Sequence, residues 1–346
     1  METDFIEDYV SKYFSIKSTH LEEKAFYLIV WDYNRDKFVQ LVEDLDKIGY
    51  LPFIDEYEDN YKINIVNKPK HGESRTHINV ILFIATIFST VFVGYLFAGG
   101  NITHLSEESL IQGIFFSIAL LAIIGTHETA HYLNANKHNI KATLPYFIPA
   151  PTLIGTFGAI INIKSAIPTK DALFDLGVSG PIAGFIVTIP VLIIGFNLSH
   201  VAPLQPGSYV FEPPLLMQLI MYFTTPPIPS GYELYVHPIA FAGWVGIIVT
   251  MLNLMPIASL DGGHISRSIF NGKIHQYISL AGIIVMFALG WYAMAVITAG
   301  FIIFFARNHP GALDNVSKLS RNRKIIAILT LAIFILCLAP APYISH

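Results

Sequence analysis

Six apolar runs between residues 78 and 339 constrain this sequence more than any other feature. Most of them reach the length of about 20 residues that a helix needs to cross a bilayer. Only 13% of the residues are charged, against about 25% in soluble domains. We therefore expect a polytopic α-helical membrane protein. The runs are Ile78–Ala98, Leu110–Ala135, Leu173–Leu198, Pro238–Ile257, Tyr277–Ala306 and Ile325–Ala339.

The lysines and arginines predict an orientation, because cytosolic loops of membrane proteins are enriched in both. Ten of the 21 lie in residues 1–77, and the loops 99–109 and 199–237 contain none. One multi-pass topology in the cell membrane places all 21 on the cytosolic side, together with the N-terminus. The run 277–306 has basic residues beyond both ends, so it should form a hairpin turning near Gly290 or a re-entrant segment. We expect six to seven transmembrane helices.

Residues 1–76 differ from the rest and hold 16 of the 25 acidic residues. Apolar residues at helical spacing cover 5–14 and 38–48, and strand-like segments cover 25–31, 51–54 and 61–66. We expect a small soluble α+β domain on the cytosolic side, followed by a membrane-embedded domain over residues 77–346. The acidic balance argues against a nucleic-acid partner and leaves a cytosolic partner of this domain open.

The second apolar run contains the sequence His-Glu-Thr-Ala-His at residues 127–131. On a helix, His127 and His131 lie on one face one turn apart, so both imidazoles can bind one Zn²⁺ while Glu128 reaches a water at the metal. Glu128 is also the one acidic residue deep in an apolar run after position 77, and such a charge is rare without a function. The alternative is a polar cluster lining a helix interface.

A catalytic zinc site needs a third protein ligand and an open position. Asp261 follows the fourth apolar run, and the topology brings it to the depth of His127 and His131. Asp before glycine is also a common turn residue, so the sequence leaves both roles open. His264 is the nearest competing ligand in the chain. We expect His138 and His275 in cytosolic loops, and His104, His200 and His237 on the outer side.

These residues together resemble the site-2 protease family of intramembrane zinc metalloproteases. The resemblance covers roughly residues 78–343 and fits the branch that lacks a PDZ domain, since the loop 199–237 is too short for one. It is carried by 127–131, by Asn-Leu-Met-Pro…Leu-Asp-Gly-Gly at 253–263, by Gly-Thr-Phe-Gly-Ala at 155–159, by Gly-Pro-Ile-Ala-Gly at 180–184 and by Arg-Asn-His-Pro at 307–310.

The resemblance implies that His127, His131 and Asp261 hold zinc and that Glu128 is the catalytic base. It also implies that Asn253 lies near the metal, where it can orient or stabilise the reacting carbonyl. An interhelical hydrogen bond is the alternative role of Asn253. The implied activity is hydrolysis of peptide bonds in or near transmembrane segments of membrane proteins. The orientation predicted from the lysines and arginines places the opening of the active site on the cytosolic side.

Residues 143–169 are a candidate docking element for an unwound substrate. They are rich in proline and glycine and include the strand-like segment 159–164, so we expect a re-entrant or β-hairpin element. Such backbone is tolerated at membrane depth only where it is buried or faces a cavity. An exposed edge there can pair with a substrate strand, and a structural loop that seals the site is the alternative.

Two other function classes fit part of these observations. A transporter or channel also places polar residues in a helix bundle, but related halves with interrupted helices are typical of transporters, and no internal repeat is detectable. A metal-binding scaffold without catalysis would not need Glu128.

Overall fold

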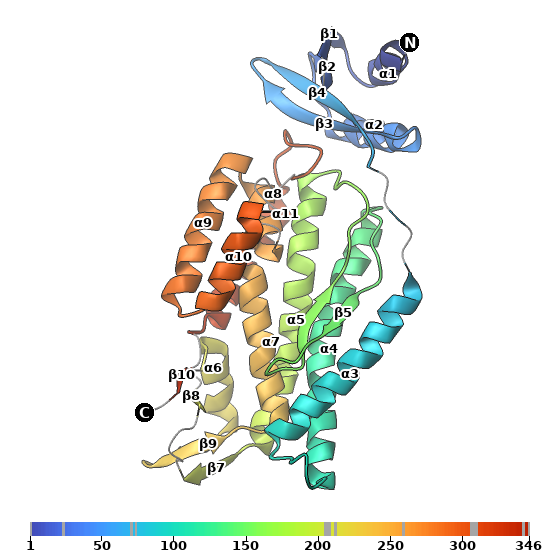
Figure 1. The fold of residues 1–346 in the computed structure, drawn as a ribbon. Helices are drawn as coiled ribbons and strands as arrows, with labels where there is room; N and C mark the ends of the chain where they lie inside the picture. Colours follow the sequence, from blue (N-terminus) through green and yellow to red (C-terminus); the bar gives the residue numbers. More distant parts are fainter. Residues whose placement is uncertain are drawn as a thin grey trace.

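The computed structural model describes residues 2–22, 25–69, 72, 75–203, 209–210, 213–257, 260–304, 311–340 and 343–344. A small sheet with two helices lies at one end of a bundle of long helices (Figure 1). The protein is thus an α-helical membrane protein with a small N-terminal region rich in β-strands.

The N-terminal region forms a four-stranded antiparallel sheet in the order β1-β2-β4-β3. Its core combines apolar side chains from the strands and from both helices, and Phe38, Leu41 and Leu45 of α2 are fully buried. The predicted helices and strands are present, and β1 was not predicted. The elements are α1 (Glu2–Ser11), β1 (Ile16–Glu22), β2 (Ala25–Val30), α2 (Arg35–Lys47), β3 (Tyr50–Tyr57) and β4 (Asn60–Asn67).

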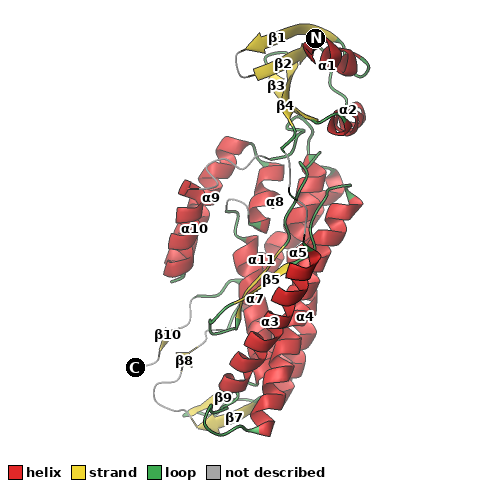
Figure 2. Cartoon of the chain, turned by 45° about the vertical axis from the view of Figure 1, so that its right-hand side comes forward, coloured by secondary structure: helices red, strands yellow, loops and turns green. Residues whose placement is uncertain are grey.

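Within the described part of the chain, three helices are long and apolar enough to cross a membrane, namely α3 (Thr76–Phe97), α4 (Glu107–Lys137) and α5 (Lys170–Leu198). They match the first three apolar runs. Helix α7 (Pro238–Leu254) lies against α4 and α5, and α11 (Arg321–Cys337) lies against α5 and α7 (Figure 2). The connection between α3 and α4 lies at the end of the bundle opposite the N-terminal sheet (Figure 1).

The fifth apolar run forms two helices, α9 (Gly272–Ala288) and α10 (Tyr292–Phe304). They are joined at Gly290, whose φ of +84° is a conformation that glycine adopts readily. This is the predicted turn position. The sequence analysis did not predict helices α6 (Leu215–Thr224), which lies in the loop 199–237, and α8 (Asp261–Ile269), which begins at a candidate metal ligand.

Polar side chains hold the membrane helices together from within. The hydroxyl groups of Thr90 on α3 and Ser117 on α4 lie 2.7 Å apart and are buried. Asn79 of α3 donates to the carbonyls of Leu144 and Pro145 at 2.8 and 2.9 Å, which fixes the start of the segment that follows α4. Such bonds are valuable in a bilayer, which offers no water to replace them.

The segment after α4 contains the hairpin of β5 (Tyr146–Pro149) and β6 (Thr156–Ile160). The predicted strand at 159–164 overlaps β6 only in part, but an antiparallel bridge between Ala142 and Ile163 continues the pairing. At the end of the bundle opposite the N-terminal sheet, β7 (His200–Pro203) pairs with β9 (Tyr232–Tyr235) (Figure 1). Strand β8 (Tyr209–Val210) pairs with β10 (Tyr343–Ile344).

Candidate metal centre

Three side chains from two distant parts of the chain meet in the part of the bundle that is nearer the N-terminal sheet. Nε2 of His127 and Nε2 of His131 are 3.1 Å apart, and each lies 3.2 Å from Oδ2 of Asp261. Among the described residues these three form the one cluster of His, Cys, Asp or Glu side chains with ligand atoms mutually within 4.8 Å. The sequence prediction named the same three residues, and their role as ligands stays a prediction.

The two histidines are neighbours on α4 because they are spaced by one helical turn. Nδ1 of His131 lies 2.8 Å from the carbonyl oxygen of Leu176 on α5. A carbonyl can only accept, so the Nδ1–H of His131 donates and its Nε2 keeps a free lone pair directed at the other two ligands. The carbonyl of Leu176 therefore fixes the tautomer that metal binding requires.

Helix α5 approaches the imidazole rings closely because it presents glycine there. A Cβ atom at Gly180 would lie 2.1 Å from Nε2 of His131 and 2.7 Å from Nε2 of His127, and one at Gly184 would lie 3.3 Å from Nδ1 of His127. No side chain fits at Gly180 without displacing the rings. The segment 180–184 also carries part of the family resemblance, and the close approach to the imidazoles gives these glycines a physical reason.

Asp261 is the first residue of α8, the next described helix after α7 along the chain. A Cβ at Gly262 would lie 2.2 Å from the carbonyl oxygen of Leu254, so the chain can fold back against the end of α7 only with glycine there. The backbone oxygen of Asp261 in turn would lie 2.7 Å from a Cβ at Gly177 on α5. Glycines on both sides thus let α8 bring the Asp261 carboxylate to the two histidines.

Glu128 and Asn253 flank this cluster. Glu128 is buried on α4 beside His131, and the backbone of Ile161, just after β6, lies near its carboxylate. The amide nitrogen of Asn253, at the end of α7, lies 3.4 Å from Nε2 of His127. Both predicted catalytic residues therefore lie at the cluster, and their roles in a reaction stay predictions.

Among the remaining histidines, His275 lies in a different kind of element from the expectation, whereas His138 lies in the turn after α4. His275 was expected in a loop but lies buried in α9, where its Nδ1 is 2.6 Å from the hydroxyl of Ser266. His138 caps the end of α4 and pairs with Asp175 at 2.8 Å. His264 is one turn beyond Asp261 on α8 and is not one of the three clustered ligands. The segment 307–310 lies outside the described residues.

The cluster fits a zinc ion. Two imidazole nitrogens and one carboxylate oxygen are donors that zinc prefers in catalytic sites, with a fourth position left for water or substrate. Ligands about 2.0 Å from a tetrahedral zinc are separated by about 3.3 Å, close to the 3.1 and 3.2 Å between these atoms. His127, His131 and Asp261 are thus the residues that would hold the metal.

Fold and site together define a class: a polytopic membrane protein with a His-Glu-x-x-His metal centre on one of its long apolar helices. Comparison with known families gives the next step. The family described as peptidase family M50 matches residues 115–293, which include α7, α8 and most of α4. The chain belongs to this family, and membership disfavours the transporter reading.

Several plant proteins are similar over three-quarters of the chain. The probable zinc metalloprotease EGY1, chloroplastic, of Oryza sativa subsp. japonica is 29% identical over 304 residues, which cover 76% of this chain and 50% of that protein. The EGY1 protein of Arabidopsis thaliana is 28% identical over 303 residues, covering 76% and 53%. The chain thus spans about half the length of these relatives. No solved structure matches the chain.

Proposed function

We propose that this protein is an intramembrane zinc metalloprotease that hydrolyses peptide bonds in or near transmembrane segments of membrane proteins. The observation that carries the proposal is the meeting of His127, His131 and Asp261 within 4.8 Å. Glu128 lies beside them on a helix long and apolar enough to cross the bilayer. Membership in peptidase family M50 supports the same reaction.

In the proposed mechanism the metal, when bound, acts as a Lewis acid that polarises the scissile carbonyl and activates water. Glu128 accepts the proton of the attacking water and delivers it to the departing amine. The Asn253 amide, 3.4 Å from the His127 nitrogen, is within reach of the developing oxyanion and donates a hydrogen bond to it. The Leu176 carbonyl keeps His131 in one orientation throughout.

The hairpin provides a place for the substrate. The amides of residues 162 and 164 are directed at the facing strand, since the hydroxyl of Thr143 accepts from Asn162 at 3.0 Å and the Lys141 carbonyl accepts from Lys164 at 2.7 Å. Ile161 and Ile163 alternate with them and direct their amides to the other edge, where Glu128 lies near Ile161. An unwound substrate that pairs with this edge brings its backbone to the cluster.

We also propose the arrangement in the membrane. Residues 1–76 form a cytosolic domain, which a cytosolic partner can reach, and residues 77–346 form the membrane-embedded protease domain. The loops 99–109 and 199–237, which lack lysine and arginine, lie outside, so the active site opens toward the cytosol. Helices α9 and α10 together cross the bilayer twice as a short hairpin, which gives seven spans.

The test compares the purified wild-type protein with Glu128→Gln and with the matched control Glu108→Gln, which changes an exposed residue in the first turn of the same helix. Each is incubated in detergent with a panel of single-span membrane proteins, and bound zinc is measured. We expect one zinc in all three and cleavage by wild type and control only. Loss of general-base catalysis should lower the rate by about 10²–10⁴-fold. Absence of bound zinc from the wild type would refute the proposal.

A further inference from the structure

Residues 311–317, here called the strap, join the N-terminal sheet to the membrane helices. The strap runs parallel to the edge strand β3, with the Leu313 carbonyl accepting from Ile54 at 2.9 Å and the Ile54 carbonyl accepting from Asn315 at 3.1 Å. The side chain of Leu313 is buried in the core of the N-terminal region. The strap is therefore attached to the edge of that sheet by a single parallel bridge and by the burial of Leu313.

The same strap is bonded to the segment that leads into α5. The amide of Leu313 donates to the carbonyl of Ile167 at 2.9 Å, and that of Asp314 donates to the carbonyl of Pro168 at 3.2 Å. Asp314 is fully buried and accepts from the hydroxyl of Tyr33 at 2.7 Å. Burial and this bond raise the pKa of Tyr33, so its phenol stays protonated and keeps donating at physiological pH.

Asn315 connects the sheet to α8 through its side chain. Its Nδ2 donates to Oδ1 of Asp55 on β3 at 3.0 Å, and its Oδ1 accepts from Nη2 of Arg267 at 2.9 Å. Arg267 is buried in the last turn of α8, whose first residue is Asp261. Because α8 is only 9 residues long, a bond that fixes one end of it also restrains the other end.

A second connection reaches the other side of the cluster. Arg35, the first residue of α2, donates to Oδ2 of Asp171 in the first turn of α5 at 2.9 Å. Asp171 is buried and also accepts from Arg323 of α11 at 2.9 Å. Five residues further along α5 is Leu176, whose carbonyl orients His131.

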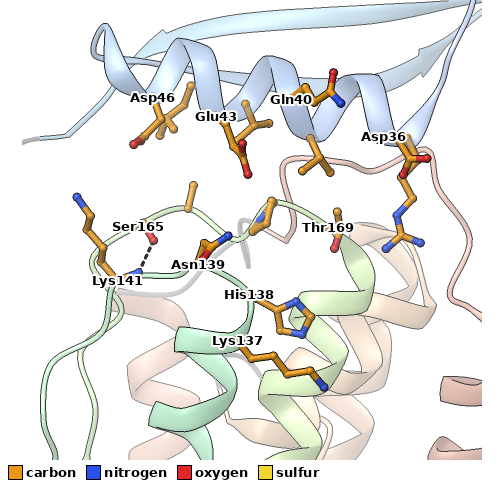
Figure 3. A pocket seen from close by; sticks show the side chains of 16 residues that line it. Asp36, Gln40, Glu43, Asp46, Lys137, His138, Asn139, Lys141, Ser165 and Thr169 are labelled. Carbon is orange, nitrogen blue, oxygen red and sulfur yellow. Dashed lines mark hydrogen bonds between the residues drawn. The ribbon is translucent and has the colours of Figure 1, made fainter.

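Among the described elements, no helix of the bundle packs broadly against the N-terminal sheet or its two helices. A cavity of about 590 Å³ separates α2 from the loops beneath it. Figure 3 shows Asp36, Gln40, Glu43 and Asp46 on its upper wall and Lys137, His138, Asn139 and Lys141 below. The position of the N-terminal region on the bundle therefore depends on a few specific bonds.

We propose that Asn315 and Arg35 are positioning residues, through which the docked N-terminal region holds Asp261 and His131 in their metal-binding positions. This inference rests on the proposed metal site. Partners that orient metal ligands without touching the metal typically contribute 10–100-fold to metal affinity. Displacement of the N-terminal region from the bundle should therefore lower the affinity of the site for zinc.

The Asn315 connection is tested by exchanging its two partners in the full-length protein. Asn315→Asp keeps the acceptor for Arg267 but places a carboxylate against Asp55. Asp55→Asn combined with Asn315→Asp restores a donor and an acceptor in reversed order. Zinc affinity is measured by competition with a chromophoric chelator, and the visible spectrum of the cobalt-substituted protein reports ligand geometry. Lys318→Ala, an exposed residue next to the strap, is the control.

We expect the single variant to bind zinc about tenfold more weakly, with an altered cobalt spectrum, and the double variant to return to within about twofold of wild type. An unchanged affinity and spectrum in the single variant would overturn the proposal, and so would a loss that the double variant does not reverse. If Asn315→Asp fails to fold, Arg35→Gln at the half-exposed end of α2 gives the same test, with Lys37→Gln as its control. A wild-type protein that binds no zinc contradicts the proposed function instead.

Discussion

The N-terminal sheet region and the membrane helices expose opposite kinds of side chain. In the sheet region the interior is apolar, with Phe38, Leu41 and Ile63 fully buried, and most charged groups face outward. In the helices many large apolar residues also point outward, as Phe88 and Ile118 do at 73% and 61% exposure. Inside the bundle, hydroxyls, glycines and the candidate metal ligands lie among buried apolar side chains such as Phe116 and Leu120.

This difference in exposed side chains indicates which interactions stabilise each region. Water excludes apolar side chains, so the sheet region is stabilised by removing them from water. Lipid tails are as apolar as leucine, so the helices gain little from apolar burial alone and associate through close packing and polar contacts. A bundle organised around polar contacts already has a place where ligands for a metal are tolerated.

The largest effect is expected from Leu41→Ala in the core of the sheet region. Removing a fully buried leucine side chain should lower the free energy of unfolding of this region by about 2–5 kcal/mol. Amide hydrogen exchange of β2 and β4 in the intact protein measures the change. Exchange of the amides of α4 and α5 should stay as in wild type. A loss below about 1 kcal/mol would show that this core is not what stabilises the region.

Gly180→Ala addresses the polar interior of the bundle. Because the new Cβ would lie 2.1 Å from Nε2 of His131, the rings must move, and we expect zinc affinity to fall by about 100-fold, the upper end for groups that orient ligands. Zinc competition measures it. Gly300→Ala on α10, where an added Cβ meets nothing within 4 Å, should leave the affinity unchanged. Equal affinities for both variants would mean that α5 does not constrain the histidines.

A smaller effect is expected from Thr90→Val, which removes the 2.7 Å contact with Ser117 at nearly constant volume. Interhelical hydrogen bonds in membranes contribute about 0.6 kcal/mol on average. Unfolding of the detergent-solubilised protein by a denaturing detergent should show a loss of that order. Thr103→Val in the exposed loop before α4 is the control.

The smallest effect is expected from Ile118→Ala, on the outward face of α4. Its side chain faces lipid in the folded bundle and would still face lipid after the helices separate. The free energy of unfolding should therefore change by less than about 0.5 kcal/mol. Leu120→Ala, two residues away and fully buried, should be several times more harmful in the same assay. Similar losses for both would contradict the assignment of this face to the bilayer.

The sequence predicted those parts of the fold that depend on local patterns. Apolar length gave α3, α4 and α5, and the spacing of His127 and His131 gave two ligands on one turn of one helix. The prediction that Asp261 lies near His127 and His131 needed both helices to reach the same side of the membrane. The positions of the lysines and arginines indicated that they do. Helix α6 was missed because its 10 residues follow prolines in a segment that resembles a loop.

Other features could not be read from local pattern. The fit of Gly180 against two imidazoles depends on where α5 crosses α4. The chain Asp55–Asn315–Arg267 joins three residues from three separate elements, each of which is an ordinary surface residue when taken alone. A single sequence carries no signal that such residues meet, because their contact is set by the packing of the whole molecule.

Because the strap lies late in the chain, its contacts with β3 can form only late in the synthesis of the protein. Asp55 and Asn315 are 260 residues apart, and every candidate ligand lies between them in the chain. A ribosome therefore releases the N-terminal sheet with β3 open long before the strap has been made, and open edge strands readily pair with other chains. The nascent sheet needs shielding through the insertion of nearly all the apolar runs. Asn315 is synthesised only when translation is almost finished. An incomplete chain therefore lacks the proposed contact that positions Asp261 for metal binding.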